Sequence, residues 1–243
     1  MKIKRVILLA MIGFLGVVAA SAQPLSIYTE NNPPASYAKD GEPAGMAVEI
    51  VREILNRLKQ PDTIEIVPWA RGYNMALSHA DVALFSATRL PQRENLFHWV
   101  KPIYTQTWGF YALKGSNIEI RSLEDAKGAG RIGTYRDDAK EQFLKQNGFT
   151  NIVSANRNII NVRHLFQGNI DLWVSSDLNV SHIVEQAGQA PSQLELAYPF
   201  RKVENYIVFS IETDTVRVRA WQKSLDEMKQ DGTYQRIVNQ RAK

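Results

Sequence analysis

A regular alternation of strand-like and helix-like segments is the strongest constraint on how this chain can fold. Residues 51, 54, 55 and 58 are apolar at the spacing of one helix face, for example, and the run 64–67 that follows reads as a strand. Short strand-like runs recur at 25–28, 64–67, 82–85, 108–113, 131–134, 152–153, 171–174 and 206–209. This alternation predicts an α/β protein with two mostly parallel sheets flanked by helices.

The N-terminus reads as an export signal. Lys2, Lys4 and Arg5 precede an apolar run over 6–20, and Ala20-Ser21-Ala22 is a small-x-small cleavage site, so we predict a signal peptide over 1–22. The chain contains no cysteine, which excludes both a disulfide and a lipid anchor at the cleavage site. We therefore expect a soluble periplasmic protein, with secretion to the outside as the alternative.

Charge and catalytic motifs exclude several functions. The whole chain has 29 Lys and Arg against 25 Asp and Glu, and three of the bases leave with the signal peptide. The nearly balanced remainder gives no basic stripe for nucleic acid. The four histidines are scattered without metal-site spacing, and no GxSxG, HExxH or P-loop pattern is present. We predict no enzyme activity, no metal and no cofactor.

The stretch 81–100 carries the clearest candidate for a binding site. Its apolar run 82–85 predicts a central strand covered on both faces, and Ser86 and Thr88 follow where that strand ends. Pro91 suits the first turn of a helix, which would also hold Arg93. Ligands of open α/β sheets bind at the carboxyl ends of strands, and a guanidinium offers a planar fork of donors to a carboxylate or phosphate. A surface arginine in a helical turn is the alternative.

Several motifs, taken in order, resemble a known family. They are NPP at 32–34 before the Gly41-x-x-x-Gly45 turn, ATRLPQRE at 87–94, SLED at 122–125 through Gly133, LFQGNID at 165–171 and DGTY at 231–234. Together they are similar to the bacterial family 3 periplasmic solute-binding proteins over residues 24–240. VPWAR at 67–71 and ENLFHW at 94–99 are similar to a poorly characterised subgroup of that family.

The resemblance implies a two-lobed fold of the type II periplasmic-binding-protein class. Lobe 1 would comprise 24–110 plus 204–243, and lobe 2 would comprise 111–203. Two crossings, near 108–113 and 199–205, would form a hinge, and the ligand would lie in the cleft between the lobes.

The resemblance also assigns residues of lobe 1. It places Arg93 at the carboxylate-binding arginine, and Ser86 and Thr88 at strand-end positions that contact the ammonium or carboxylate of the ligand. Trp69 lies near an aromatic that walls in the ligand, with a packed core tryptophan as the alternative. Arg71 is either a second anion clamp or the partner of a neighbouring acid.

In lobe 2 the sequence departs from the family pattern. Asp137 and Asp138 stand in place of a Gly-Ser/Thr pair whose amides bind the carboxylate, and they would either line the cleft or only cap a helix. The ammonium-binding aspartate of the family falls on Ser176, with Asp177 one position beyond.

We therefore expect a protein that captures an amino acid or a related carboxylate or amine and delivers it to an inner-membrane ABC permease. We expect a monomer without a nucleic-acid partner. An enzyme similar to cyclohexadienyl dehydratases on the same fold, using Glu30, Asp137, Asp138 or Asp177 as acid or base, is one alternative. An orphan ligand-sensing module is the other.

Overall fold

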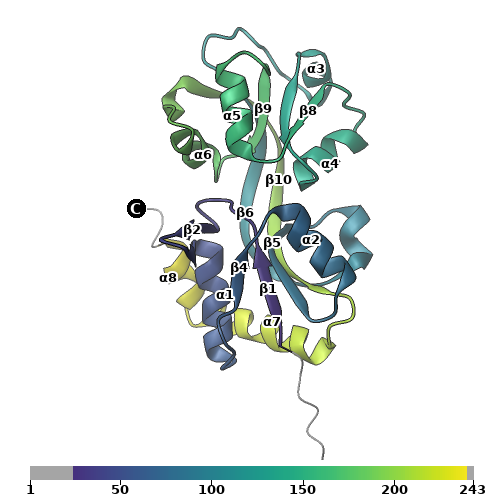
Figure 1. Ribbon diagram of the computed structural model, residues 1–243, viewed down its shortest axis with the longest axis vertical. Helices are drawn as coiled ribbons and strands as arrows, with labels where there is room; N and C mark the ends of the chain where they lie inside the picture. Colours follow the sequence, from purple (N-terminus) through teal and green to yellow (C-terminus); the bar gives the residue numbers. More distant parts are fainter. Residues whose placement is uncertain (1–23, 240–243) are drawn as a thin grey trace, which may run out of the picture.

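The computed structural model describes residues 24–239, and the predicted signal peptide at 1–22 lies outside them. Figure 1 shows two lobes stacked along the long axis of the molecule. In chain order the elements are β1 (Ser26–Thr29), β2 (Tyr37–Lys39), β3 (Glu42–Ala44), α1 (Met46–Arg57), β4 (Ile64–Ile66), α2 (Trp69–Ser78), β5 (Val82–Thr88), the 3₁₀ helix η1 (Pro91–Leu96), β6 (Phe97–Leu113), α3 (Leu123–Gly128), β7 (Ile132–Tyr135), α4 (Ala139–Gln146), β8 (Ile152–Ala155), α5 (Asn158–Phe166), β9 (Leu172–Ser176), α6 (Val180–Gln186), the 3₁₀ helix η2 (Pro191–Gln193), β10 (Leu194–Ser210), α7 (Thr215–Gln230) and α8 (Thr233–Asn239).

Eight strands form one continuous hydrogen-bonded sheet in the order β4-β1-β5-β10-β6-β9-β7-β8. β1 pairs in parallel with β4 and β5 in the lower lobe of Figure 1, and β7 pairs in parallel with β8 and β9 in the upper lobe. β10 is antiparallel to β5 and β6, and β6 is antiparallel to β9. The predicted α/β class is therefore confirmed, with the two expected parallel sheets joined into one.

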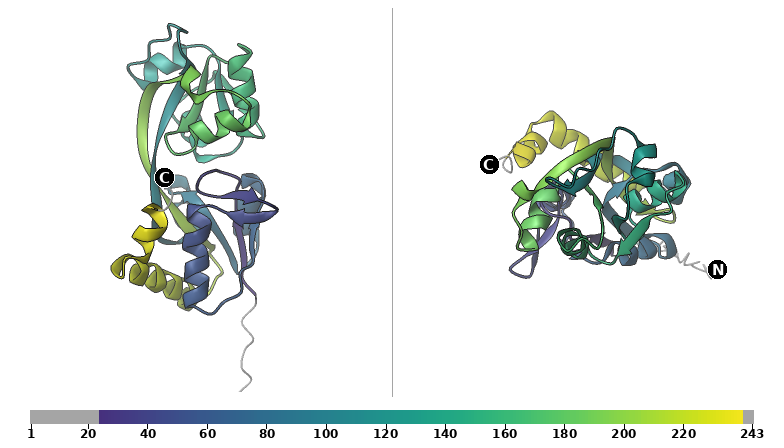
Figure 2. Two further views of the ribbon diagram at one scale, coloured as in Figure 1. Left: turned by 90° about the vertical axis from the view of Figure 1, so that its left-hand side faces the viewer. Right: turned by 90° about the horizontal axis from the view of Figure 1, so that it is seen from above.

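Two long strands join the lobes. β6 and β10 have 17 residues each, and they pair antiparallel from Leu194 opposite Leu113 to Ser210 opposite Phe97. Figure 2 shows both strands running from one lobe into the other. Of these two strands the sequence predicted only 108–113 and 206–209, and it predicted that Pro91 and Arg93 lie in the first turn of a helix, where the structure has the six-residue 3₁₀ helix η1. The boundaries proposed for the lobes stay a prediction, because β6 and β10 run from one lobe into the other without a break that would mark a boundary.

β5 lies at the centre of the core of lobe 1. All seven of its residues are buried. Ala83 and Phe85 face the cluster built on α1 and α7, whereas Val82 and Leu84 face the cluster built on α2. This alternation of side chains confirms a strand covered on both faces, as its unbroken apolar run predicted.

Lobe 2 repeats this layered arrangement around β9. Leu172 and Val174 pack on one face with Leu144 of α4, and Trp173 packs on the other face with Val162 and Leu165 of α5. The loops after β1 and β7 and the C-terminal end of β5 lie at the junction between the lobes, since residues 30, 138 and 88 line a common cavity there. Within 24–239, no helix combines the length and the apolar character that crossing a bilayer requires.

Trp221 provides a test of the core of lobe 1. Its side chain is fully buried, packs edge-to-face on Phe209 with 5.1 Å between ring centroids, and donates from Nε1 to Gln60 Oε1 at 3.2 Å. We expect Trp221→Ala to lower the free energy of unfolding by about 3–5 kcal/mol in urea denaturation. Val216→Ala, at an exposed position of the same helix, should change it by about 0.5 kcal/mol or less. A loss below about 1 kcal/mol for Trp221→Ala would contradict this description of the core.

Candidate functional site

A small polar cavity lies between the two lobes. Its volume is about 20 Å³, which is room for about one water molecule. Most of its lining comes from lobe 1, at the ends of β1 and β5, at the start of α2, on η1 and on the two long strands. The lining residues are Glu30, Asn32, Trp69, Ser86, Thr88, Arg93, Gln106 and Asn205 from lobe 1, and Asp138, Ala139 and Lys140 from lobe 2. The sequence predicted five of these as ligand-binding: Trp69, Ser86, Thr88, Arg93 and Asp138.

Arg93 is a buried cation that forms no ion pair with any residue in the described part of the chain. It follows Pro91 on η1, its side chain is 1% exposed, and its guanidinium carbon lies 5.2 Å and 4.9 Å from the ring centroids of Trp69 and Tyr73. Its hydrogen bonds go to uncharged acceptors, the carbonyl of Thr88 at 3.4 Å and Gln142 Oε1 at 3.0 Å. Burial lowers the pKa of the guanidinium. This cation is therefore available to an anion that enters the cavity.

Other polar groups of the lining are also incompletely satisfied. Asn205 Oδ1 accepts from Thr88 Oγ1 at 3.2 Å and from Gln106 Nε2 at 3.3 Å. Buried atoms of the lining without a hydrogen-bond partner within the described chain include Trp69 Nε1, Arg93 Nε, Gln106 Oε1 and Asn205 Nδ2. A buried polar group without a partner costs about 1–3 kcal/mol, so several of them around one cavity indicate a place for a polar ligand.

Ser86 holds an unusual backbone conformation beside these groups. Its φ is +69°, in the left-handed region that non-glycine residues seldom adopt. The register between β5 and β10 shifts opposite it, between Tyr206 and Ile207. Such a conformation costs about 1–3 kcal/mol and is concentrated at functional sites. It turns the end of β5 so that both Ser86 and Thr88 line the cavity.

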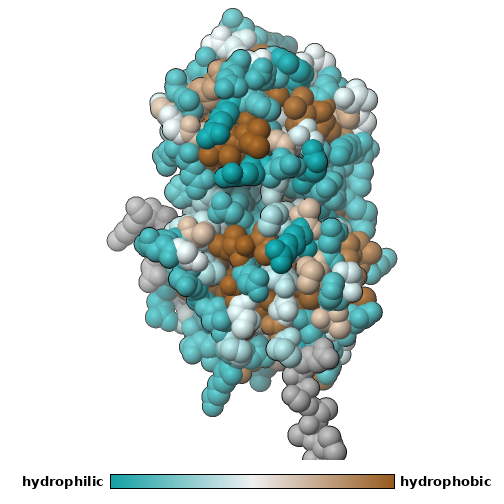
Figure 3. Space-filling model, viewed as in Figure 1, coloured by the Kyte–Doolittle hydropathy of each residue, from teal (hydrophilic) through white to brown (hydrophobic). Residues whose placement is uncertain are grey.

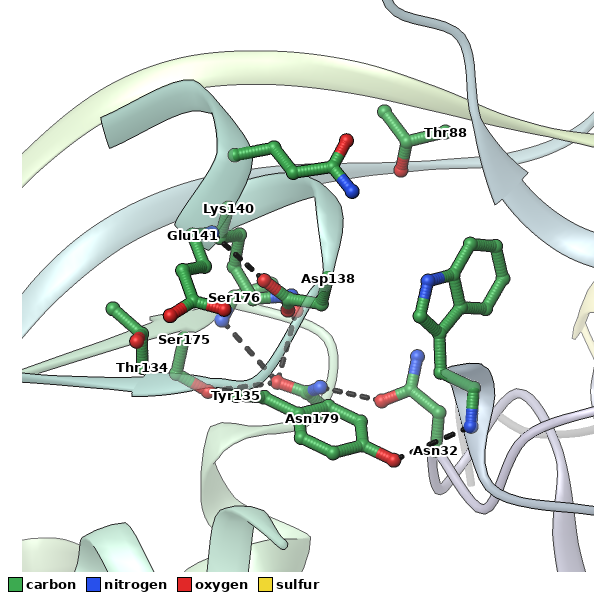
Figure 4. Close-up of polar contacts among 12 residues, drawn as sticks. Asn32, Thr88, Thr134, Tyr135, Asp138, Lys140, Glu141, Ser175, Ser176 and Asn179 are labelled. Atoms are coloured by element: carbon green, nitrogen blue, oxygen red, sulfur yellow. Dashed lines mark hydrogen bonds and ion pairs between the residues drawn. The ribbon is translucent and has the colours of Figure 1, made fainter. Parts of the chain in front are cut away.

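Asp138 both caps a helix and lines the cavity. Its Oδ1 accepts from the backbone N–H of Glu141 at 2.8 Å, which makes it the N-cap of α4. Its Oδ2 forms an ion pair with Lys140 Nζ at 2.7 Å, and both side chains are nearly buried. Figure 4 shows this pair at the start of α4, facing the cavity. Asp138 therefore caps α4 and also lines the cavity.

Glu30 adds a second carboxyl group. Burial raises its pKa from 4.5 to about 7, with a smaller raising effect from Asp138, against the lowering effects of Lys140 and Arg93. The cavity thus holds two cationic groups, one ionised carboxylate and one carboxyl group that exchanges its proton near neutral pH. Such a set can accept both the anionic and the cationic end of a small molecule.

The other predicted site residues lie outside the lining. Asp137 is exposed and has a φ of +58°, which separates its side chain from that of Asp138. Asp177 is exposed, and its Oδ1 accepts from the backbone N–H of Thr107 on β6 at 2.8 Å. Arg71 is exposed on α2, away from the lining. The sequence placed these residues by their neighbours in the motifs, and the local backbone directs them elsewhere.

Ser176 contributes to a contact between the lobes instead. Its hydroxyl donates to Asn179 Oδ1 at 2.9 Å, as does that of Ser175. Asn179 Nδ2 in turn donates to Asn32 Oδ1 of lobe 1 at 2.5 Å, and Figure 4 shows the two amides facing each other. These hydrogen bonds link β9 of lobe 2 to the loop after β1 of lobe 1.

Sequence reasoning missed Lys140, Gln106 and Asn205. Lys140 lies two residues after the N-cap of α4, a position that carries no signal of its own. Gln106 and Asn205 lie on the long strands and face the cavity only because of how β6 and β10 are paired. Within 24–239, no group of three or more His, Cys, Asp or Glu side chains is placed to hold a metal ion.

The raised pKa of Glu30 predicts a pH dependence of stability. The folded chain binds this proton more tightly than the unfolded chain, so folding stability falls as the pH rises from about 4.5 to about 7 and levels off above that. Between pH 5 and pH 8 we expect wild type to lose on the order of 3 kcal/mol of unfolding free energy relative to Glu30→Gln. Urea denaturation of both proteins at the two pH values measures this. Parallel pH profiles for the two proteins would show that Glu30 titrates normally.

The comparisons with known proteins agree with this architecture. The structure superimposes on a histidine kinase sensor domain described as similar to periplasmic binding proteins, with a TM-score of 0.79 and 17% identity over 89% of this chain and 95% of that one. It matches a mutant of the arginine-binding protein ArgBP from T. maritima with a TM-score of 0.77 and 16% identity, over 89% and 94% of the two chains. An ancestral arginine-binding protein bound to arginine superimposes with a TM-score of 0.76 and 20% identity, over 89% of this chain and 97% of that one.

These structural likenesses establish the fold, and the type II two-lobed architecture expected from the sequence is confirmed. Comparison with the curated proteins finds no match. A family model described as bacterial extracellular solute-binding proteins, family 3, matches residues 25–241. Because that match covers nearly the whole chain, the protein belongs to family 3 of the bacterial extracellular solute-binding proteins.

Proposed function

We propose that this protein captures a small zwitterion, an amino acid or a closely related molecule, in the cavity between its lobes. The observation that carries the proposal is Arg93, a buried guanidinium whose hydrogen bonds go only to uncharged acceptors and whose Nε is unpaired. A carboxylate would supply the missing anion through charge-assisted hydrogen bonds, which are about twice as strong as neutral ones.

The two acids of the cavity support an ammonium group as the other end of the ligand. Asp138 already has Lys140 as its partner, whereas Glu30 is kept partly protonated at neutral pH by burial. An ammonium beside Glu30 would favour the ionised carboxyl and lower its pKa. In this arrangement the binding of a zwitterion near pH 7 releases a proton from Glu30.

Binding requires the lobes to move. A cavity of about 20 Å³ is too small for any amino acid, so a ligand enters when the lobes separate and is enclosed when they close again. β6 and β10 are the crossings about which such a hinge motion would take place. The contact from Asn179 to Asn32 and that from Gln142 to Arg93 link the two lobes, and both would break on opening.

The family supports a role in solute uptake. We propose that the protein is exported to the periplasm by the predicted signal peptide and acts as a monomer that delivers its ligand to an inner-membrane ABC permease. One similar structure is described as the substrate-binding protein of an amino acid ABC transporter. The known likeness of the chain is thus to binding proteins rather than to enzymes.

One observation favours a second candidate function, an enzyme on this fold. A carboxyl group with a pKa of about 7 in a polar cavity is suited to general acid–base chemistry, and Glu30 has that property. Turnover of prephenate or arogenate by the purified protein would identify a dehydratase, and Glu30→Gln should then abolish it. Binding without turnover would support the capture function and reject the enzyme.

A thermal-shift screen of amino acids, small peptides, polyamines and carboxylates tests the capture function, because a ligand of the folded state raises the melting temperature. For the ligands that bind, we expect Arg93→Ala to weaken binding more than tenfold in isothermal titration calorimetry, since it leaves the carboxylate of the ligand unpaired. Arg121→Ala removes an exposed arginine of lobe 2 and should bind as wild type does.

Unchanged affinity in Arg93→Ala would remove this guanidinium from the site. A screen in which no zwitterion shifts the melting temperature would reject the proposed function itself.

Asp138→Asn tests the charge of lobe 2 without removing the helix cap, because asparagine caps helices as well as aspartate does. We expect the variant to fold normally and to lose at least threefold of its affinity for ligands with an ammonium group, while carboxylates without one bind no more weakly. Asp214→Asn, at the equivalent N-cap position of α7, is the matched control and should change neither affinity. Equal losses for both ligand classes in Asp138→Asn would reduce Asp138 to a structural cap.

A further inference from the structure

A second, larger cavity lies beside the polar one in the groove between the lobes. Its volume is about 270 Å³, close to the lower end of the range for small-molecule sites. Apolar side chains from both lobes form most of its wall: Pro33, Val67 and Pro68 on one side, and Tyr135, Ile159 and Ile183 on the other. Figure 3 shows apolar surface on each lobe next to the groove that divides them. We call this cavity the apolar chamber.

The apolar chamber and the polar cavity share two segments of lobe 1. In the loop after β1, Asn32 lines the polar cavity while Pro33 lines the apolar chamber. At the start of α2, Trp69 lines the polar cavity and Pro68 lines the chamber. Each of these two segments therefore contributes neighbouring residues to both spaces.

The rest of the partition consists of contacts between the lobes. The backbone N–H of Trp69 donates to the Tyr135 hydroxyl at 3.4 Å, and Asn179 donates to Asn32 at 2.5 Å. In each pair the two residues belong to different lobes, and Figure 4 shows this for Asn179 and Asn32. In the proposed function, both contacts would open when the lobes separate, and the two spaces would then form one continuous groove.

We infer that the ligand occupies both spaces, with its charged end in the polar cavity and a large apolar side chain in the apolar chamber. The inference rests on the proposed function and names the class of ligand: an amino acid with an aromatic or branched aliphatic side chain. The charges of the site are concentrated in the polar cavity, whose own volume of about 20 Å³ leaves no room for a side chain of that size. The chamber supplies the room and apolar walls.

The composition of the wall argues against a cationic side chain. The described lining of the chamber contains no Asp or Glu, and its charged member is Arg157, which would repel a second cation. Several similar structures are described as arginine-binding proteins, and the polarity of this chamber predicts a different choice of ligand. An apolar side chain packed against these walls gains from leaving water.

Isothermal titration calorimetry of the mature protein with L-phenylalanine, L-leucine, L-alanine and L-arginine tests the inference. We expect phenylalanine and leucine to bind at least tenfold more tightly than alanine, and arginine to bind no more tightly than alanine. Alanine carries the same charged end without the side chain, so its affinity reports the polar cavity alone.

Ile159→Ser tests the chamber directly. Ile159 is half-buried at the start of α5 and is not part of the core clusters of the described chain, so its replacement should preserve the fold. We expect at least a fivefold loss of affinity for phenylalanine and less than a twofold change for alanine. Ile211→Ser, at an exposed position after β10, is the matched control and should alter neither affinity.

The outcomes separate this inference from the function on which it rests. If alanine binds as tightly as phenylalanine, or if Ile159→Ser weakens both equally, the apolar chamber is not part of the site, while capture of zwitterions stands. Tighter binding of arginine than of phenylalanine overturns the inference in the same way. If no zwitterion binds at all, the inference and the proposed function both fail.

Discussion

The antiparallel pairing of β6 with β10 is the interaction on which the rest of the structure depends. It joins the two lobes into one sheet, and its register places Val203 opposite Gln106 and Asn205 opposite Tyr104 at the level of the cavity. Gln106 and Asn205 therefore reach the polar cavity from neighbouring strands and hydrogen-bond there. In the proposed function, a modest bend in both of these strands would change the width of the groove while each lobe keeps its own core.

The electrostatics of the cavity follow from burial more than from direct ion pairs. Arg93 lies beside two aromatic rings, those of Trp69 and Tyr73, which attract a cation without neutralising it. Lys140 and Asp138 compensate each other at the start of α4, and Glu30 is held near the midpoint of its titration by the loss of solvent. A folded protein keeps such groups at a cost in stability, and in the proposed function that cost is offset when a zwitterion supplies the missing partners.

Local pattern predicted much of this fold, and pairing between distant segments accounts for the rest. The apolar run of β5, the amphipathic face of α1 and the turn at Pro91 are local features, so the sequence located Arg93 beside the end of a strand. The full lengths of β6 and β10 depend on each other across about a hundred residues, and polar stretches within them carry no strand signal. Asp137 and Asp138 are adjacent, yet only Asp138 turns inward, because backbone torsions that no spacing rule specifies separate them.

One contact of Arg93 has a consequence for selectivity. The guanidinium already donates a hydrogen bond to an amide oxygen of the opposite lobe, Gln142 Oε1, at 3.0 Å. In the proposed binding reaction, a solute has to replace this hydrogen bond to the Gln142 amide before it can bind the guanidinium. A carboxylate gains by the exchange because it carries a full charge, whereas a solute whose acceptor is itself an amide only replaces like with like. In the proposed function, the contact with Gln142 would therefore favour carboxylates over neutral solutes.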